Sequence, residues 1–454
     1  MTNEWHQLTA LELGEEIQQG TIDPVDLTEY YLGRIKEKDP DNVIYVRLTE
    51  ERALQEAKAA SVRAKSGVRR SELDGVPISW KDLFDTAGVK TEAGTQLLEG
   101  RVPEHDAECL QRATRAGLVC LGKTNMPDLA FSGLGNNPWT GTGSNPFDTE
   151  QDRVPGGSSA GAALSVYHGL AAAAIGSDTA GSVRIPAAWC GITGLKTTHG
   201  LISLDGSVPL SPSQDTVGPL TRDIADANAL TAILSGRKAA DLTGATLKGT
   251  RILRATTVFD DLVDPEINEA LKAALEKLRA AGAEIVEGEV PAFKDVLESC
   301  NENGYPGMLE GYAIWGDQIR ETPDRIFSSI GNRFLAGEKF GAANALKLEF
   351  ALKKFKVDYL KQTAGFDLVV GATQPSIPPL LDKLYADESY YLDMALMSIS
   401  LTRLGNLLGL CATTLPAGMA LGFPVGMMLM APGFEEGKLL RLSFAAENAL
   451  RGKS

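Results

Sequence analysis

One stretch of the chain decides how the rest is interpreted: Gly176-Ser177-Asp178-Thr179-Ala180-Gly181-Ser182, followed by Val183-Arg184-Ile185-Pro186. A second run of small residues precedes it, Pro155-Gly156-Gly157-Ser158-Ser159-Ala160-Gly161. A lone lysine, Lys81, ends the apolar segment 75–80. Serines flanked by glycine and alanine, together with a lysine that would lose its hydration on burial, indicate acyl-transfer chemistry that does not use histidine.

A serine hydroxyl becomes a good nucleophile only when a base removes its proton. The usual base is histidine, and the chain has four, His6, His105, His168 and His199. Residues 157–161 match the G-x-S-x-G elbow of α/β-hydrolases, but that fold needs a histidine late in the chain, and none follows His199. The S-x-x-K spacing at 235–238 lacks the partner motifs of β-lactamases and is interpreted as a loop.

Lys81 is the better candidate base. Burial disfavours an ammonium ion and lowers its pKa, and a neutral lysine amine can accept a proton from a serine. The alternative is a structural ion pair of Lys81 with Asp82 or Asp85 at the end of a strand.

The backbone amides of Thr179, Ala180, Gly181 and Ser182 could converge on one point, as an oxyanion hole requires. Glycine-rich loops also bind phosphate, but neither G-x-x-x-x-G-K-[ST] nor G-x-G-x-x-G is present. The small residues of 160–176 are interpreted as a closely packed helix.

Composition narrows the functional class. The 454 residues carry a net charge of −15, which disfavours direct binding to nucleic acid or to an anionic membrane. Prolines interrupt the nearly uncharged segment 404–433, so it is not expected to span a bilayer. The N-terminus shows no signal peptide, and the five scattered cysteines are typical of reduced thiols. We therefore expect a cytoplasmic protein with no metal site and no cofactor.

Periodicity predicts one α/β domain spanning residues 1–454. Residues 1–60 are expected to form N-terminal helices, with Thr9, Asp23 and later Asp264 as helix caps. Strands and helices alternate over 75–230 and again over 247–291. Residues 295–363 are predicted to be a helical cover, followed by a strand at 366–370, two strands within 404–431 and a closing helix at 434–451.

These segments together resemble the amidase signature family. The match follows that family's ordered pattern: G-x-P-x-x-x-K-D at 75–82, G-K-T-N-M at 122–126, G-G-S-S-x-G at 156–161 and D-T-x-G-S-x-R-x-P-A at 178–187. The resemblance covers about residues 60–450 and implies an α/β/α sandwich whose mixed, mostly parallel twisted sheet is covered by helices.

The resemblance also implies roles for individual residues. Ser182 corresponds to the nucleophile, Ser158 to a bridging serine after a cis peptide bond, and Lys81 to the general base, with the amides of 179–182 as the oxyanion hole. Supporting roles are expected for Ser159, Asp178 and Arg184. Residues 132–147 are expected to line the acyl pocket, and the substrate-binding candidates are Met126, Gly133, Asn136 and Ser159.

The implied activity is hydrolysis of a small carboxamide through an acyl-enzyme, by a free-standing enzyme that could form a homodimer. The alternative is the glutamine-hydrolysing A subunit of a tRNA-dependent amidotransferase. That subclass is expected to carry a G-Y-Y-D-A-Y type segment, whereas the nearest stretch here is Gly341-Ala342-Ala343-Asn344-Ala345-Leu346. A third hypothesis, a binding protein without activity, is disfavoured because all three catalytic side chains are present.

Overall fold

The computed structural model describes residues 4–452, and all strands in that range belong to one sheet of eleven strands. Residues 1–3 lie outside the described range, and they belong to the N-terminal segment in which no signal peptide is expected. The sheet order is β1-β3-β2-β4-β6-β5-β10-β11-β9-β7-β8. The strands are β1 (Tyr45–Leu48), β2 (Pro77–Lys81), β3 (Val119–Thr124), β4 (Ala173–Ser177), β5 (Thr193–Lys196), β6 (Val217–Thr221), β7 (Arg251–Ala255), β8 (Glu284–Gly288), β9 (Leu368–Ala372), β10 (Cys411–Ala420) and β11 (Phe423–Ala431).

The sheet is mixed, as predicted. The expectation that most pairs are parallel needs correction, because four of the ten strand pairs are parallel and six are antiparallel. Strand β2 runs parallel to β3 and β4, and β7 runs parallel to β8 and β9. The centre differs because β10 and β11 form a tight hairpin, which only antiparallel strands can make.

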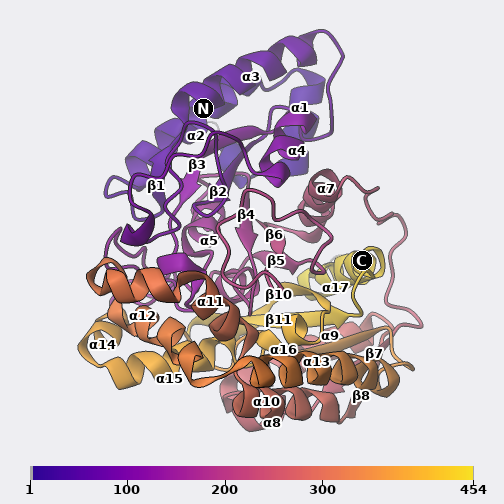
Figure 1. Ribbon diagram of the computed structural model, residues 1–454. Helices are drawn as coiled ribbons and strands as arrows, with labels where there is room; N and C mark the ends of the chain where they lie inside the picture. Colours follow the sequence, from indigo (N-terminus) through magenta and orange to yellow (C-terminus); the bar gives the residue numbers. More distant parts are fainter. Residues whose placement is uncertain (1–3, 453–454) are drawn as a thin grey trace.

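Helices cover this sheet (Figure 1). They are α1 (Ala10–Gln19), α2 (Pro24–Lys38), α3 (Glu50–Lys65), α4 (Glu108–Ala116), α5 (Ala160–Tyr167), α6 (Arg184–Trp189), α7 (Ile224–Ser235), α8 (Phe259–Leu262), α9 (Pro265–Ala280), α10 (Pro291–Asn303), α11 (Pro306–Glu321), α12 (Ser328–Leu335), α13 (Ala342–Gln362), α14 (Leu381–Ala386), α15 (Glu388–Ile399), α16 (Arg403–Leu407) and α17 (Glu436–Arg451). The small residues of 160–176 divide between α5 and β4, so the expectation of one helix there is wrong.

Two of the three predicted helix caps form. Thr9 makes a capping box with Glu12, and the Asp23 carboxylate accepts the Val25 N–H. Asp264 occupies the position before α9, but its side chain accepts no hydrogen bond from the first turn of the helix.

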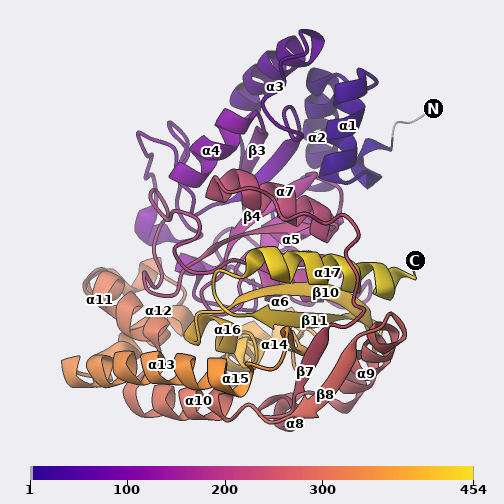
Figure 2. The ribbon, with the colours of Figure 1, turned by 90° about the vertical axis from the view of Figure 1, so that its right-hand side faces the viewer.

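The packing of the helices on the sheet places the two serine-rich loops. Helix α17 packs against α7, α9, β10 and β11, and Figure 2 shows α7 and α17 in front of the central strands. Helix α5 contacts β2, β3, β4 and β6, while α6 contacts α5, β5, β10 and β11. Both α5 and α6 follow the serine-rich loops directly, so the loops lie where these helices meet the sheet.

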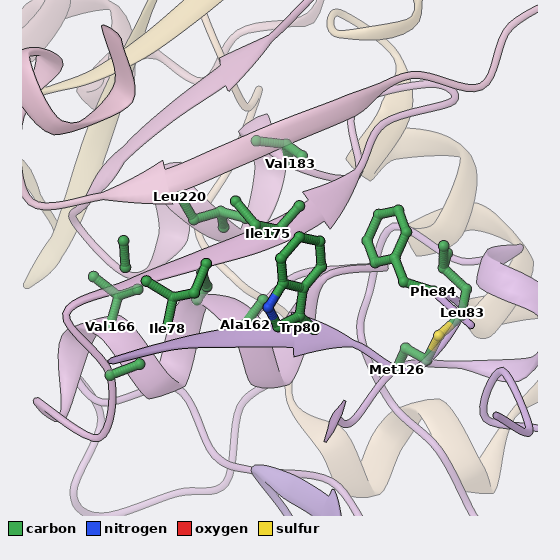
Figure 3. Close-up of a cluster of buried hydrophobic side chains, with 14 of the residues drawn as sticks. Ile78, Trp80, Leu83, Phe84, Met126, Ala162, Val166, Ile175, Val183 and Leu220 are labelled. Carbon is green, nitrogen blue, oxygen red and sulfur yellow. The ribbon is translucent and has the colours of Figure 1, made fainter. Parts of the chain in front are cut away.

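A buried apolar cluster fixes strand β2, from which Lys81 extends. Trp80 packs edge to face on Phe84 with ring centroids 5.7 Å apart, and Ile78, Ile175 and Val183 belong to the same buried cluster (Figure 3). Full burial of such side chains contributes about 1.5–3 kcal/mol each. Within residues 4–452, no helix combines the length and the apolar character needed to cross a bilayer.

Candidate active site

Lys81 is the last residue of β2, and its side chain is fully buried. Its Nζ donates hydrogen bonds to Ser158 Oγ at 2.6 Å and to Ser177 Oγ at 2.9 Å. Side chains alternate along a strand, so Lys81 shares a face with Ser79, which hydrogen-bonds Ser165 of α5. The lysine therefore points toward the loop that leads into α5.

Burial lowers the pKa of Lys81 to about 7, against the opposing influence of the Asp178 and Asp215 carboxylates. The alternative of a structural ion pair with Asp82 or Asp85 is wrong. Asp82 pairs with Arg47 at 2.8 Å and Lys123 at 3.3 Å, and Asp85 pairs with Arg101. Other cations satisfy both carboxylates, and Lys81 is left with hydroxyl partners only.

Ser158 follows a cis peptide bond between Gly157 and Ser158. The loop packs against segment 133–135, where Gly157 N–H donates to Gly133 O at 2.8 Å. A Cβ at Gly157 would lie 2.6 Å from the Gly135 nitrogen, so only glycine permits this approach. The neighbouring Ser159 N–H donates to Ser182 O at 3.1 Å, which brings the two serine loops together. Among the described residues, no hydrogen bond joins the hydroxyls of Ser158 and Ser182 directly.

Asp178 organises the loop that holds Ser182. Its carboxylate accepts the N–H groups of Gly181 and Val183 and pairs with Arg184 at 2.9 Å, with both side chains fully buried. Burial alone would raise the pKa of Asp178, but Arg184, Lys196 and Asn406 lower it to about 2. Asp178 and Arg184 thus support the loop without lining the cavity, as the resemblance implies.

Three of the four predicted oxyanion amides are available. The Gly181 N–H is the exception, because the turn at Gly181, with φ of 133°, directs it to Asp178 Oδ1 at 2.8 Å. Among the described residues, the N–H groups of Thr179, Ala180 and Ser182 have no hydrogen-bond acceptor. All three residues line one cavity, and Ala180 avoids the positive φ that would strain an alanine.

This cavity measures about 220 Å³. Its wall comes mainly from 130–133, from the serine loop, from 305–308 at the start of α11, and from helices α12, α15 and α16. Most of the wall is apolar: Phe131, Leu210, Met308, Leu392, Leu396, Ile399 and Leu407. Arg333 and Arg403 are its only charged residues within the described chain, and Ser182 is its nucleophile candidate.

Only one of the four predicted substrate-binding residues, Gly133, lines the cavity. Met126 packs into the core beside Leu83 and Phe84 (Figure 3). Asn136 and Ser159 are fully buried away from the cavity, and Ser159 Oγ donates to Ser177 O. Of the segment 132–147, Ser132 and Gly133 reach the wall. The expectation is wrong for the others: residues 133 and 134 accept hydrogen bonds from the backbone of the Ser158 loop, and the chain beyond them leaves the cavity.

Sequence reasoning missed several residues of the site. Ser177 gives Lys81 its second hydroxyl partner, and its place at the end of β4, beside β2, was the available signal. Thr402 Oγ1 donates to Ala180 O at 2.6 Å, and Asn406 contacts Asp178. The cover therefore includes α15 and α16 as well as α11 and α12 from the predicted range 295–363.

The described residues contain no group of three His, Cys, Asp or Glu side chains arranged to hold a metal ion. All five cysteines are buried and free.

Comparison with known proteins gives one family. The sequence pattern of the Amidase family matches residues 26–440. The chain is 31% identical to the A subunit of the glutamyl-tRNA(Gln) amidotransferase of Caldanaerobacter subterraneus, covering 99% of this chain and 97% of that protein. A solved structure of an amidase is 31% identical with a TM-score of 0.87, covering 97% of this chain and 99% of that one. The peptide amidase PAM with the competitive inhibitor chymostatin is 26% identical with a TM-score of 0.83, covering 100% and 99%. The chain therefore belongs to the amidase signature family.

Proposed function

We propose that this protein hydrolyses the C–N bond of a small carboxamide, with Ser182 as nucleophile, Ser158 as proton relay and Lys81 as general base. The observation that carries the proposal is the buried Lys81 amine, hydrogen-bonded to Ser158 Oγ at 2.6 Å in a loop adjoining Ser182. A base is useful near the pH at which it titrates, and burial lowers the pKa of Lys81 to about 7.

In the proposed cycle, uncharged Lys81 takes the proton of Ser158 while Ser158 takes the proton of Ser182. The Ser182 oxygen attacks the amide carbon, and the oxyanion is stabilised by the free N–H groups at 179, 180 and 182. The proton returns through Ser158 to the leaving nitrogen, so ammonia or an amine departs and an acyl-enzyme remains. Water then attacks the ester, uses the same relay and releases the acid.

We favour a free-standing amidase over a glutamine-hydrolysing subunit. Glutamine carries an α-ammonium group that needs a carboxylate partner when it is buried. No Asp or Glu is among the described residues that line the cavity, and its two charged residues are arginines. An ammonium group would be repelled there.

The second candidate is the glutaminase subunit of an amidotransferase. It is favoured by the similarity to the A subunit of glutamyl-tRNA(Gln) amidotransferase over nearly the whole chain. In that role the chain would pass the ammonia released from glutamine to a partner subunit.

An ammonia-release assay separates the two candidates. The purified chain is given aliphatic and aromatic carboxamides and glutamine, each with the Ser182→Ala variant as control. Turnover of simple amides by the chain alone supports the amidase. Turnover of glutamine only, and only with a partner present, assigns the amidotransferase role.

A further inference from the structure

The cavity contains an arginine that has no anionic partner. Arg403 begins α16, and its guanidinium lies over the Tyr305 ring at 4.7 Å from the centroid. Its Nε is buried without a hydrogen-bond partner, and no carboxylate pairs with it among residues 4–452. A guanidinium has five N–H donors, and each buried donor left unbonded is costly.

A second arginine lies on the same wall. Arg333 of α12 donates to Phe131 O at 2.6 Å and stacks over the Phe131 ring at 4.3 Å. It too forms no ion pair in the described chain. Burial lowers the pKa of Arg333, and the charge of Arg403 lowers it further. Both arginines line the same cavity, so their like charges disfavour each other there.

Two uncompensated guanidinium groups in an apolar cavity are a binding site for an anion. Arginine's planar fork matches a carboxylate with two parallel hydrogen bonds. We propose that the acyl part of the substrate ends in a carboxylate held by Arg403 and Arg333, while the amide lies at Ser182. This inference rests on the proposed function and names its substrate class: monoamides of dicarboxylic acids with an apolar chain.

The wall explains why a carboxylate fits better than a phosphate. Phe131, Leu396 and Leu407 line the same cavity as the arginines, and burying a second negative charge in it would add a large desolvation cost. The absence of an acidic lining residue within the described chain also excludes an amino group on the acyl chain. An uncharged, apolar chain between the carboxylate and the amide of the substrate suits the apolar remainder of the cavity wall.

The test compares substrates of equal length that differ only in the terminal group: adipamate with hexanamide, and glutaramate with pentanamide. Hydrogen bonds to a charged group change binding constants about 10- to 100-fold. The wild type should therefore have a kcat/KM at least about tenfold higher for each carboxylate substrate than for the matching uncharged amide. In Arg403→Met and Arg333→Met this preference should fall toward one. The control is Arg279→Gln on α9, an exposed arginine paired with Glu276, which should retain the wild-type preference.

Calorimetry with the Ser182→Ala variant measures binding without turnover. Adipate should bind more tightly to it than to Ser182→Ala combined with Arg403→Met. Wild-type enzyme that hydrolyses hexanamide as well as adipamate overturns the inference and leaves the proposed function intact, even if the arginine variants fail to fold. Tighter binding of inorganic phosphate than of adipate also overturns it. If the enzyme hydrolyses no amide but Ser182→Ala still binds adipate in a way that depends on Arg403, the proposed function is wrong and the anion site stands.

Discussion

Replacing Lys81 with methionine removes the proposed base while keeping much of the buried volume. The side chain is fully buried, and its only hydrogen-bond partners are the hydroxyls of Ser158 and Ser177. General-base catalysis contributes about 10²- to 10⁴-fold, so kcat should fall by at least that factor in Lys81→Met. Ammonia release at neutral pH measures the loss.

The wild-type pH profile follows from the same residue. Only the uncharged amine can accept a proton, so kcat/KM should rise with pH and level off above the pKa of Lys81, about 7. At two pH units below that value, activity should be about a hundredfold below the plateau. The profile is measured from pH 5 to 9 at constant ionic strength.

The free energy of unfolding should depend on pH because of the titration of Lys81. In the unfolded chain the lysine keeps its proton up to about its ordinary pKa of 10.5, whereas the folded protein releases it near pH 7. Between these values the unfolded state binds more protons, so wild-type stability should rise with pH, relative to Lys81→Met, by about 1.4 kcal/mol per pH unit. Urea unfolding of both proteins at pH 7 and 9 should show the difference changing by about 2–3 kcal/mol.

Three results would each refute this reasoning. The first is near-normal kcat in Lys81→Met at neutral pH. The second is an acid limb whose midpoint lies near 4 or near 10. The third is a stability difference between the two proteins that does not change between pH 7 and 9. Circular dichroism of Lys81→Met provides the control, because the activity comparison requires a folded variant.

Other residues give simpler predictions. Ser182→Ala should abolish turnover and labelling by a fluorophosphonate probe, seen by mass spectrometry, with an unchanged circular dichroism spectrum; labelling that persists would move the nucleophile elsewhere. Arg184→Met leaves Asp178 buried and unpaired, and should lower the free energy of unfolding by about 3–5 kcal/mol in urea; a change below about 1 kcal/mol would contradict that role. A homodimer of this chain would sediment with a mass of twice 48.3 kDa, and a mass of 48.3 kDa would show a monomer.

The parts of the site that the sequence predicted are those encoded in contiguous segments. Glycine and serine runs marked the two loops, and the apolar strand before Lys81 predicted its burial. Helix ends were also predictable where caps are local, as for the capping box at Thr9. The Asp178 interaction with Gly181 escaped prediction because it depends on where one carboxylate turns within its loop.

The cavity wall escaped prediction for a different reason. Arg333, Leu396 and Arg403 lie far along the chain from Ser182 and belong to short helices without a motif. Their distance from the serine loop depends on how the cover packs on the sheet, and no local pattern encodes it. Antiparallel pairing at the centre of the sheet was missed likewise, because pairing joins segments such as β5 and β10 that are far apart in sequence.

The choice of Lys81 as base can also be argued from its partners. Three lysines are fully buried or nearly so: Lys81, Lys123 and Lys196. Lys123 lies 3.3 Å from the Asp82 carboxylate, which favours its charged form. Lys196 donates to two backbone carbonyls, which accept hydrogen bonds but cannot donate one to the lone pair of a neutral amine.

Lys81 alone of these three has only hydroxyl partners. A hydroxyl accepts from an ammonium and donates to an amine, so both protonation states of Lys81 can be hydrogen-bonded in the same geometry. Proton transfer at Lys81 then needs a rotation of hydroxyl hydrogens and no rearrangement of heavy atoms. That property is what a relay through Ser158 requires, and it would hold even if the pKa of Lys81 differed from about 7. A chain that replaced Ser158 and Ser177 with carbonyl acceptors would keep the lysine buried and lose the base.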